Sequence, residues 1–305
     1  MRIIVTGAGG FIGNRLVHRL LEQEHQVVAL DRMIDGTPKD AIALAGDLCN
    51  DAIRAAALTQ GCDAIIHLAT LPGGAAERDP AASRRINVDA MYDLLLDAGR
   101  AGNRPRFVFA SSIAVFGDPL PAFVDDQTAL SPKMIYGGHK AMMEQAVAMF
   151  SNRGLIDGVS LRLPGIVARP KGPSELKSAF MSNLFHALKA KQAFTSPVSA
   201  QGTMWLQSLD RTIENLVLAL LLDPALLPPT HAVTLPALRV TMDALVREVA
   251  RHCDAPLDLV TYAPDAALEA AFAAQPPLST NAAERAGLAH DGTLERLVSS
   301  ALASI

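Results

Sequence analysis

Cysteine is scarce in this chain of 305 residues. The three cysteines, Cys49, Cys62 and Cys253, are scattered and odd in number. They show neither the spacing of a zinc site nor the even count of a disulfide framework, which favours a reducing compartment. No two of the eight histidines stand at metal-ligand spacing with an acid. We therefore predict a cytoplasmic protein without a metal site.

Long apolar runs and runs of like charge are also missing. The longest apolar run, residues 216–222, is far shorter than the roughly 20 residues that a membrane helix needs. The N-terminus enters a predicted strand at once, so we expect no signal peptide. The net charge is −4 and no basic run occurs, which argues against nucleic-acid and membrane partners. Hydrophobic residues make up 50% of the chain, enough for one large domain or two unequal ones.

A glycine-rich turn stands near the N-terminus, between a predicted strand at 2–5 and a predicted helix from residue 11. Its spacing is Gly7-x-x-Gly10-x-x-Gly13. Gly7 would permit the tight turn, Gly10 the close approach of phosphates, and Gly13 close packing of helix on strand. The N–H groups and the dipole at the start of such a helix attract a pyrophosphate. The turn therefore predicts a dinucleotide site.

An acid at the end of the next predicted strand indicates which dinucleotide binds. Asp31 follows the apolar stretch 26–30, and its carboxylate can accept hydrogen bonds from both hydroxyls of an adenosine ribose. The same carboxylate would repel the 2′-phosphate of the phosphorylated cofactor. Arg32 argues the other way, because an arginine can pair with that phosphate. On balance we predict NAD.

Short apolar stretches alternate with amphipathic ones along the first half of the chain. Apolar strands of this kind are typical of a parallel sheet that is covered on both faces. The alternation predicts an α/β fold with a Rossmann-type doubly wound parallel sheet. The predicted strands are 2–5, 26–30, 41–45, 64–68, 107–111 and 159–163, and the predicted helices are 11–24, 52–59, 81–101 and 135–152.

Proline is frequent in the second half, where the regular alternation ends. We expect an NAD-binding Rossmann domain at 1–163, with a return segment at 204–222. Residues 164–203 and 223–305 are expected mainly in a smaller, C-terminal substrate-binding lobe. The helices predicted in this half are 174–191, 209–222, 241–252 and one or two within 281–305.

Four polar residues in the middle of the chain suggest the chemistry. Ser111 and Ser112 end a predicted strand, and the carboxyl ends of parallel strands border the ligand crevice, so we expect both serines to face the reactive end of the cofactor. Tyr136 and Lys140 stand four apart on a predicted helix, and therefore on one face. The lysine ammonium and an oxidised nicotinamide would lower the pKa of the phenol from about 10. Tyr136 could then remove a proton from a substrate hydroxyl as hydride leaves its carbon, with Ser112 holding the oxygen and Lys140 binding the nicotinamide ribose.

Several motifs resemble the extended short-chain dehydrogenases/reductases of the NAD-dependent epimerase/dehydratase family. They are Thr6-Gly7-Ala8-Gly9-Gly10-Phe11-Ile12-Gly13, Gly46-Asp47-Leu48, His67-Leu68-Ala69-Thr70 and Ile86-Asn87-Val88. Ser112, Tyr136 and Lys140 fall on the catalytic serine, tyrosine and lysine of that family. The resemblance implies further cofactor contacts from Phe11, Ile12, Asp47, Leu48, Leu68, Ala69, Asn87 and Pro164.

Two segments, 106–121 and 161–170, resemble more narrowly the sugar-acid dehydrogenases that act on D-erythronate. The nucleotide-sugar epimerases of the family place an asparagine near Pro164 and Gly165, and this chain does not. The likeness implies oxidation of a hydroxyl next to a carboxylate, with a 2-oxo acid and NADH as products. Two alternatives stay open: a nucleotide-sugar epimerase or dehydratase that keeps its NAD bound, and a nucleotide-sensing regulator, which the Tyr136–Lys140 pair argues against.

Candidates for the substrate side are few. Arg169, Lys171 and Arg85 could bind a substrate carboxylate, although surface charge is the commoner role of such residues. Trp205 either packs between the lobes or walls the substrate pocket. His67, on a predicted buried strand, is expected in the core or beside the cofactor rather than as a proton carrier.

Apolar residues recur on two of the predicted helices, within 81–101 and 135–152. The second contains methionines at 142, 143 and 149. Core packing explains such residues in general, but in the family that the chain resembles the two helices meet their symmetry mates in a four-helix bundle. The resemblance therefore implies a homodimer.

Overall fold

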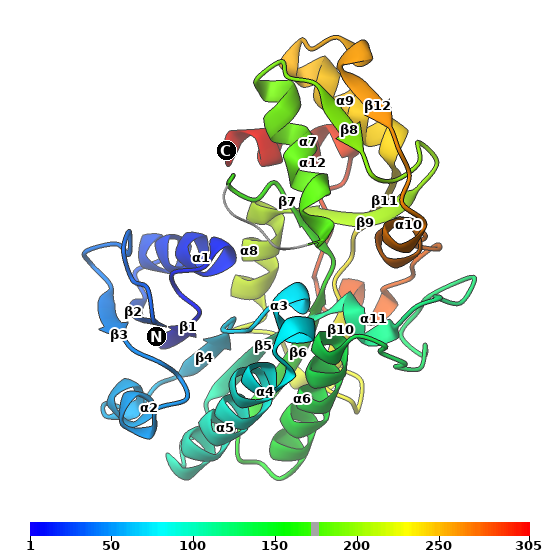
Figure 1. Ribbon diagram of the computed structural model, residues 1–305. Helices are drawn as coiled ribbons and strands as arrows, with labels where there is room; N and C mark the ends of the chain where they lie inside the picture. The colour runs from blue at the N-terminus through cyan, green and yellow to red at the C-terminus, as the bar shows by residue number, and fades with distance from the viewer. Residues whose placement is uncertain (172–176) are drawn as a thin grey trace.

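Parallel strands form the centre of the larger lobe in the computed structural model, which describes residues 1–171 and 177–305 (Figure 1). The order of the strands from β3 to β6 is that of the doubly wound dinucleotide-binding sheet, which confirms the predicted fold class. In spatial order they are β10 (Ala232–Thr234), β6 (Asp157–Leu163), β5 (Arg106–Ser112), β4 (Ala64–His67), β1 (Arg2–Thr6), β2 (Gln26–Asp31) and β3 (Ile42–Ala45).

Helices cover both faces of this sheet. On one face lie α1 (Phe11–Glu22) and α8 (Leu209–Leu218), and on the other α2 (Asp51–Leu58), α5 (Ala90–Arg100) and α6 (Ile135–Asn152) (Figure 1). Side chains alternate along a strand, so successive residues of β1 pack on opposite faces of the sheet. Ile3 and Val5 pack with α1 and α8, whereas Ile4 packs with α5 and α6, and all three are fully buried.

The connection from β4 to α5 is more broken than the single helix predicted at 81–101. It contains α3 (Gly73–Arg78), α4 (Pro80–Arg84) and a π-helical turn, η1 (Arg85–Asp89). Asp79 begins α4 by accepting a hydrogen bond from the Ala82 N–H at 2.9 Å, with Pro80 in the first turn. α3 was not predicted, because its two glycines are poor helix formers.

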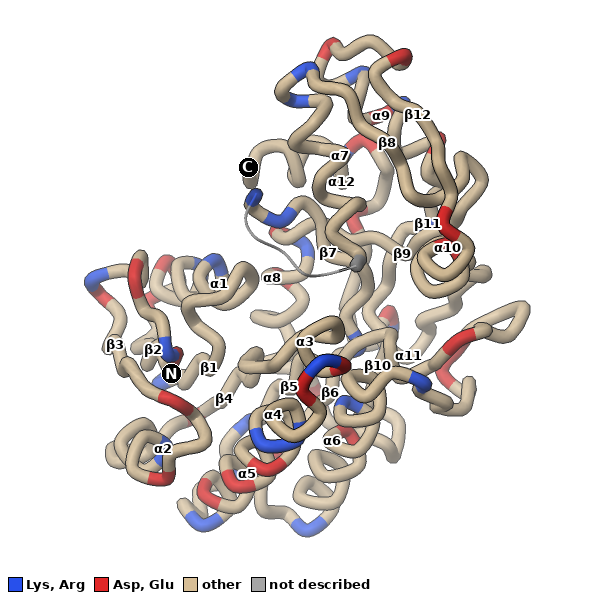
Figure 2. Tube along the Cα trace, in the orientation of Figure 1, with Lys and Arg blue, Asp and Glu red and all other residues tan. Residues whose placement is uncertain are grey.

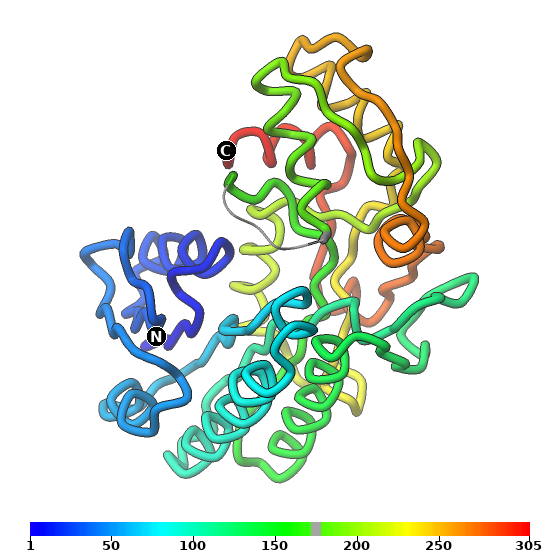
Figure 3. Tube along the Cα trace, viewed as in Figure 1, coloured from blue at the N-terminus to red at the C-terminus, as the bar shows by residue number. Residues whose placement is uncertain are grey.

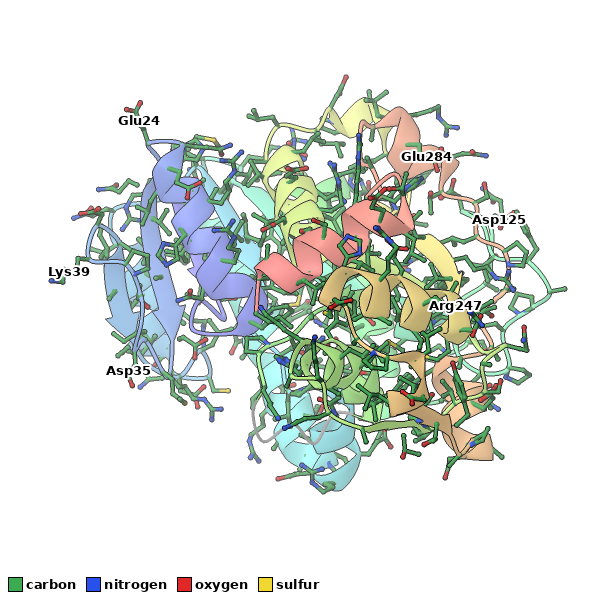
Figure 4. The ribbon with its side chains drawn as sticks, turned by 90° about the horizontal axis from the view of Figure 1, so that it is seen from above. Glu24, Asp35, Lys39, Asp125, Arg247 and Glu284 are labelled. Atoms are coloured by element: carbon green, nitrogen blue, oxygen red, sulfur yellow. The ribbon has the colours of Figure 1, made fainter. Side chains whose placement is uncertain are left out.

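The smaller lobe has a sheet of its own. The strands of this sheet lie in the order β11 (Leu238–Thr241), β9 (Thr203–Ser208) and β7 (Gly165–Val167). A separate pair is formed by β8 (Phe194–Ser196) and β12 (Val260–Tyr262). α7 (Phe180–Lys189), α9 (Met242–Cys253) and α12 (Leu294–Ala303) enclose its core, and α9 and α12 lie side by side when the molecule is seen from above (Figure 4). The start of the helix predicted at 174–191 lies outside the described residues.

The chain passes between the two lobes repeatedly in its second half (Figure 3). Two elements of the segment expected mainly in the smaller lobe belong with the large sheet: β10 pairs with β6, and α11 (Asn281–Arg285) packs beside β10. β10 is a short strand that follows two prolines, so it carries too little periodicity to be found from sequence. The exact boundary between the lobes stays a prediction.

Charged residues are scattered along the whole tube, with no long run of one colour (Figure 2). Within the described ranges, no helix is both long and apolar enough to cross a membrane. The remaining short elements are η2 (Ile113–Phe116), η3 (Lys177–Ala179), η4 (Pro224–Leu226), η5 (Leu257–Leu259) and α10 (Ala266–Phe272).

Candidate active site

In the glycine turn after β1, the backbone of the turn lies close to the backbone of β2 and of the first turn of α1. Gly7 has a φ of +73°, and its N–H donates to the Leu30 carbonyl at 2.9 Å. A Cβ added to Gly13 would lie 2.0 Å from the Gly7 oxygen, so only glycine lets α1 approach the turn this closely. Gly10 offers no side chain to cap the helix, and the contact of the Phe11 and Ile12 N–H groups with an anion stays a prediction.

Asp31 is held at the carboxyl end of β2 by two backbone groups. One carboxylate oxygen accepts a hydrogen bond from the Gly9 N–H at 3.0 Å, and the other from the Met33 N–H at 3.1 Å. A Cβ on Gly9 would lie 1.9 Å from the Met33 oxygen. Sequence reasoning missed Gly9; its position beside Gly10, in a turn that has to meet the acid after β2, was the available signal.

Hydrogen bonds hold residues 46–49, the segment expected to contact adenine. The Asp47 carboxylate accepts a hydrogen bond from the Cys49 N–H at 2.9 Å, which lowers the pKa of Asp47. Leu48 is buried, and its carbonyl accepts a hydrogen bond from Arg54 at 2.8 Å. Arg54 is in turn paired with Asp97 at 3.0 Å. This network fixes residues 46–49 beside β2.

The end of β4 lies directly against the glycine turn. The Ala69 N–H donates to the Thr6 hydroxyl at 3.3 Å, and a Cβ on Gly7 would lie 2.7 Å from the Ala69 nitrogen. Leu68 is held by the Thr6 carbonyl at 3.1 Å. His67 is buried among Thr6 and two phenylalanines, and burial lowers its pKa to about 3. It is therefore a neutral core residue and does not carry protons at neutral pH.

Asn87 lies in the π-helical turn and orders the loop after β4. Its amide accepts hydrogen bonds from Thr70 at 3.1 Å and the Leu71 N–H at 2.6 Å, and donates to the Leu71 carbonyl at 2.9 Å and Ser83 at 3.1 Å. With four such bonds and only 4% of its surface exposed, Asn87 shapes the crevice through this loop. Its direct contact with the cofactor stays a prediction.

The side chains of the two serines at the end of β5 have different hydrogen-bond partners, and their placement toward the cofactor stays a prediction. Adjacent side chains alternate along a strand. Ser112 accepts a hydrogen bond from the Ala114 N–H at 3.2 Å, and its hydroxyl acts to lower the pKa of Tyr136. Ser111 is buried and donates to Glu144 at 2.5 Å instead. Only Ser112 thus joins Tyr136 at the site.

Tyr136 and Lys140 share one face of α6, as predicted. The Lys140 Nζ lies 5.5 Å from the centre of the Tyr136 ring and donates to the Ala110 carbonyl at 2.7 Å. Burial lowers the pKa of Lys140 to about 7, and Glu144 opposes that shift. Burial raises the pKa of Tyr136, so the predicted lowering does not arise from the protein groups alone. The cation that favours the phenolate is Arg169.

Arg169 follows β7 and reaches from the smaller lobe to both helices of the site. Its guanidinium carbon lies 5.6 Å from the centre of the Phe11 ring at the start of α1. Its N–H donates to Ser182 at 3.0 Å, and its carbonyl lies 2.7 Å from a ring nitrogen of His186. Burial lowers the pKa of Arg169, while Tyr136 acts in the opposite direction. α7 therefore fixes the backbone of a cation that faces the phenol.

The other candidates differ in burial. Arg85 and Lys171 are exposed, and Pro164 is buried between β6 and β7. The contact of Pro164 with the cofactor stays a prediction. Trp205 is 1% exposed, packs with Val115, Phe116 and Val124, and donates through its ring N–H to the Pro276 carbonyl at 2.8 Å. This favours packing between the lobes over a place on the pocket wall.

His, Cys, Asp and Glu side chains in residues 1–171 and 177–305 form no cluster of three that could hold a metal ion.

These features define a nicotinamide-dependent oxidoreductase. They are a doubly wound sheet, a glycine turn facing Asp31, and a serine–tyrosine–lysine group at the same edge. Residues 3–209 match the family model described as "NAD dependent epimerase/dehydratase family". The chain belongs to that family, and its cofactor is NAD. The predicted class, an NAD-dependent dehydrogenase of the extended short-chain type, is confirmed.

Known relatives extend over most of the chain. It is 34% identical to D-erythronate dehydrogenase of Cupriavidus necator over 286 residues, 88% of this chain and 87% of the relative. The identity to D-erythronate dehydrogenase of Haemophilus influenzae is 32% over 258 residues, 82% of this chain and 81% of that one. A solved structure of a nucleoside-diphosphate-sugar epimerase from Agrobacterium tumefaciens is similar with a TM-score of 0.89 at 27% identity, covering 98% of this chain and 92% of that chain.

The glycine turn yields a stability prediction. Gly13→Ala places a methyl group against the Gly7 carbonyl, so α1 must shift, and we expect a loss of about 1–3 kcal/mol and much weaker NAD binding. Gly138→Ala is the matched control, because a Cβ there meets nothing within 4 Å and an alanine favours the helix. Thermal unfolding and titration with NADH measure both effects; an unchanged affinity in Gly13→Ala would contradict the close approach.

Proposed function

We propose that the protein oxidises the secondary hydroxyl at C2 of a small, D-erythronate-like sugar acid, giving a 2-oxo acid and NADH. The observation that carries the proposal is the convergence of Ser112, Tyr136 and the Arg169 cation at one edge of the sheet. The names of the two dehydrogenase relatives, at 34% and 32% identity over most of the chain, support the choice of substrate class.

In the proposed reaction Tyr136 removes the hydroxyl proton. When bound, NAD supplies the hydride acceptor. Ser112, whose hydroxyl acts to lower the pKa of Tyr136, holds the same substrate oxygen, so proton removal is directed to one atom. Lys140, fixed to the Ala110 carbonyl, binds the nicotinamide ribose and adds positive charge beside the phenol. The turn with Gly7, Gly10 and Gly13, with the N–H groups of Phe11 and Ile12, holds the pyrophosphate, and Asp31 the adenosine ribose.

Arg169 is proposed to bind the substrate carboxylate. Arg169 acts to lower the pKa of Tyr136, whereas Arg85 and Lys171 are exposed. A carboxylate paired with Arg169 would place the neighbouring hydroxyl carbon next to the phenol, as a 2-hydroxy acid requires. The same pairing would satisfy an arginine whose burial is costly.

A nucleotide-sugar epimerase with tightly bound NAD is the second candidate, supported by the name of the structural relative at 27% identity. It differs in one measurable respect, since an epimerase returns its hydride and releases no NADH. Without an asparagine near Pro164, a diphosphate would lose one expected partner.

The activity test follows absorbance of NADH with four- to six-carbon sugar acids, erythronate and threonate among them, and with nucleotide sugars as controls. We expect turnover on a sugar acid and a loss of about 10²–10⁴-fold in Tyr136→Phe, because the general base is removed. Tyr92→Phe, on the α5 surface, is the matched control and should retain activity. If no acid gives NADH and a nucleotide sugar is epimerised, the result would instead favour the second candidate.

Arg169→Met tests the carboxylate site. Loss of a charged hydrogen bond should raise KM for the acid about 10- to 100-fold with little change in KM for NAD. Because Arg169 lowers the pKa of Tyr136, the variant should also move the acidic limb of kcat to higher pH. Lys171→Met removes a nearby exposed cation and serves as control. Equal effects in both variants would speak against a specific role for Arg169.

We propose a homodimer formed by the outer faces of α5 and α6. Tyr92, Met142 and Met149 are 39%, 56% and 41% exposed there, an unusual concentration of large apolar side chains. Met142→Glu should yield a monomer by light scattering, whereas Met33→Glu, at a methionine 72% exposed on another surface, should leave the dimer intact. A monomeric wild-type protein would contradict the proposal.

A reducing, cytoplasmic location is proposed on the cysteines. Cys49, Cys62 and Cys253 are all free thiols, and no pair of them forms a disulfide. Free thiols of this kind are usual in reducing compartments.

A further inference from the structure

The buried carboxylate of Glu144 lies one helical turn beyond Lys140 and has no role in the proposed reaction. Glu144 is 1% exposed. It accepts hydrogen bonds from Arg162 on β6, at 3.0 Å from Nε and 2.8 Å from Nη2, and from Ser111 on β5 at 2.5 Å. Arg162 is itself 6% exposed and lies over the Phe116 ring. Three elements thus bury one acid behind the site.

Stability alone is a poor reason for such a pair. Taking two charges out of water costs about as much as their attraction returns, and well-packed apolar residues often serve equally well. Here the bidentate geometry satisfies both partners, and removing one of them would leave a buried charge unpaired. A role in the reaction accounts better for an acid placed behind the catalytic lysine.

Lys140 is the group that needs the acid. Its side chain is 3% exposed, and its Nζ donates a hydrogen bond to the neutral Ala110 carbonyl. The other titratable groups facing it are the neutral His67 from β4 and Tyr136 on its own helix. Burial brings the pKa of Lys140 down to about 7, and Glu144 is the group that opposes this shift. An ammonium in this place depends on a nearby negative charge.

We propose that Glu144, oriented by Arg162 and Ser111, is a positioning residue that keeps Lys140 charged so that the lysine can support the Tyr136 phenolate. The role acts through Lys140, since Glu144 is buried behind the site and is not expected to touch the substrate. The proposal deepens the proposed function and rests on the same tyrosine and lysine.

The test is the pH profile of Glu144→Gln. Lys140 and Tyr136 titrate as a pair. Without the Glu144 carboxylate, the state with neutral Lys140 and neutral Tyr136 becomes more favourable relative to the state with the ammonium and the phenolate. We expect both limbs of the kcat profile to move to lower pH by about one unit, and the plateau to fall about tenfold. Glu248→Gln is the matched control, since Glu248 also pairs with an arginine, Arg251, at 2.6 Å but lies on α9. Its profile should match that of the wild type.

A merely structural role predicts a different result. It would lower kcat equally at every pH and leave both limbs in place, and that outcome overturns the proposal. If Glu144→Gln fails to fold, the double variant Glu144→Leu with Arg162→Met replaces the whole pair by apolar groups of similar size. It also lacks the carboxylate, so its limbs should move in the same direction.

A readout without substrate separates this proposal from the proposed function. The dissociation constant of NADH, followed by fluorescence across pH, should show an inflection from Lys140 that disappears in Lys140→Met. In Glu144→Gln this inflection should move to lower pH. Such a shift in a protein inactive on every sugar acid would refute the substrate class yet support the role of Glu144. An unmoved inflection would overturn that role even in an active enzyme.

Discussion

The site depends on one contact between two backbones. Gly13 at the start of α1 lies so close to Gly7 that an added Cβ would be 2.0 Å from its carbonyl oxygen. This contact sets where α1 begins, and hence where its uncapped N–H groups point. It also places Gly9 within hydrogen-bond distance of Asp31 and Gly7 against Ala69. The predicted binding of the pyrophosphate and the adenosine ribose therefore depends on this contact.

The reactive end of the site combines parts from both lobes. Tyr136 and Lys140 stand on α6 of the large lobe, and Ser112 ends β5. Arg169 comes from the smaller lobe, beyond β7, with its backbone held by Ser182 and by His186 on α7. The smaller lobe thus supplies the cation that acts on the phenol, and differences in that lobe can change the substrate while the chemistry stays the same.

Local patterns predicted much of this structure. α6 begins and ends where its apolar spacing indicated, and the glycine turn, Asp31 and the Tyr136–Lys140 pair lie as expected because each depends on neighbours in sequence. The hydrogen bond from Ser111 to Glu144 was not predicted, although the alternation of a strand already separates the side chain of Ser111 from that of Ser112. Other features arise from partners far along the chain. The approach of Arg169 to Tyr136 and the pairing of Glu144 with Arg162 both require the folded sheet, and no periodicity in the sequence encodes them.

In the proposed reaction, hydride leaves C2 of a sugar acid for bound NAD. The most direct measurement is the mass of the NADH formed from an erythronate that carries deuterium at C2. The proposed reaction predicts one deuterium in each NADH, and Tyr136→Phe should form no NADH. Unlabelled NADH would show that another carbon is oxidised, and deuterium retained in an epimerised acid without net NADH would contradict the dehydrogenase reaction itself.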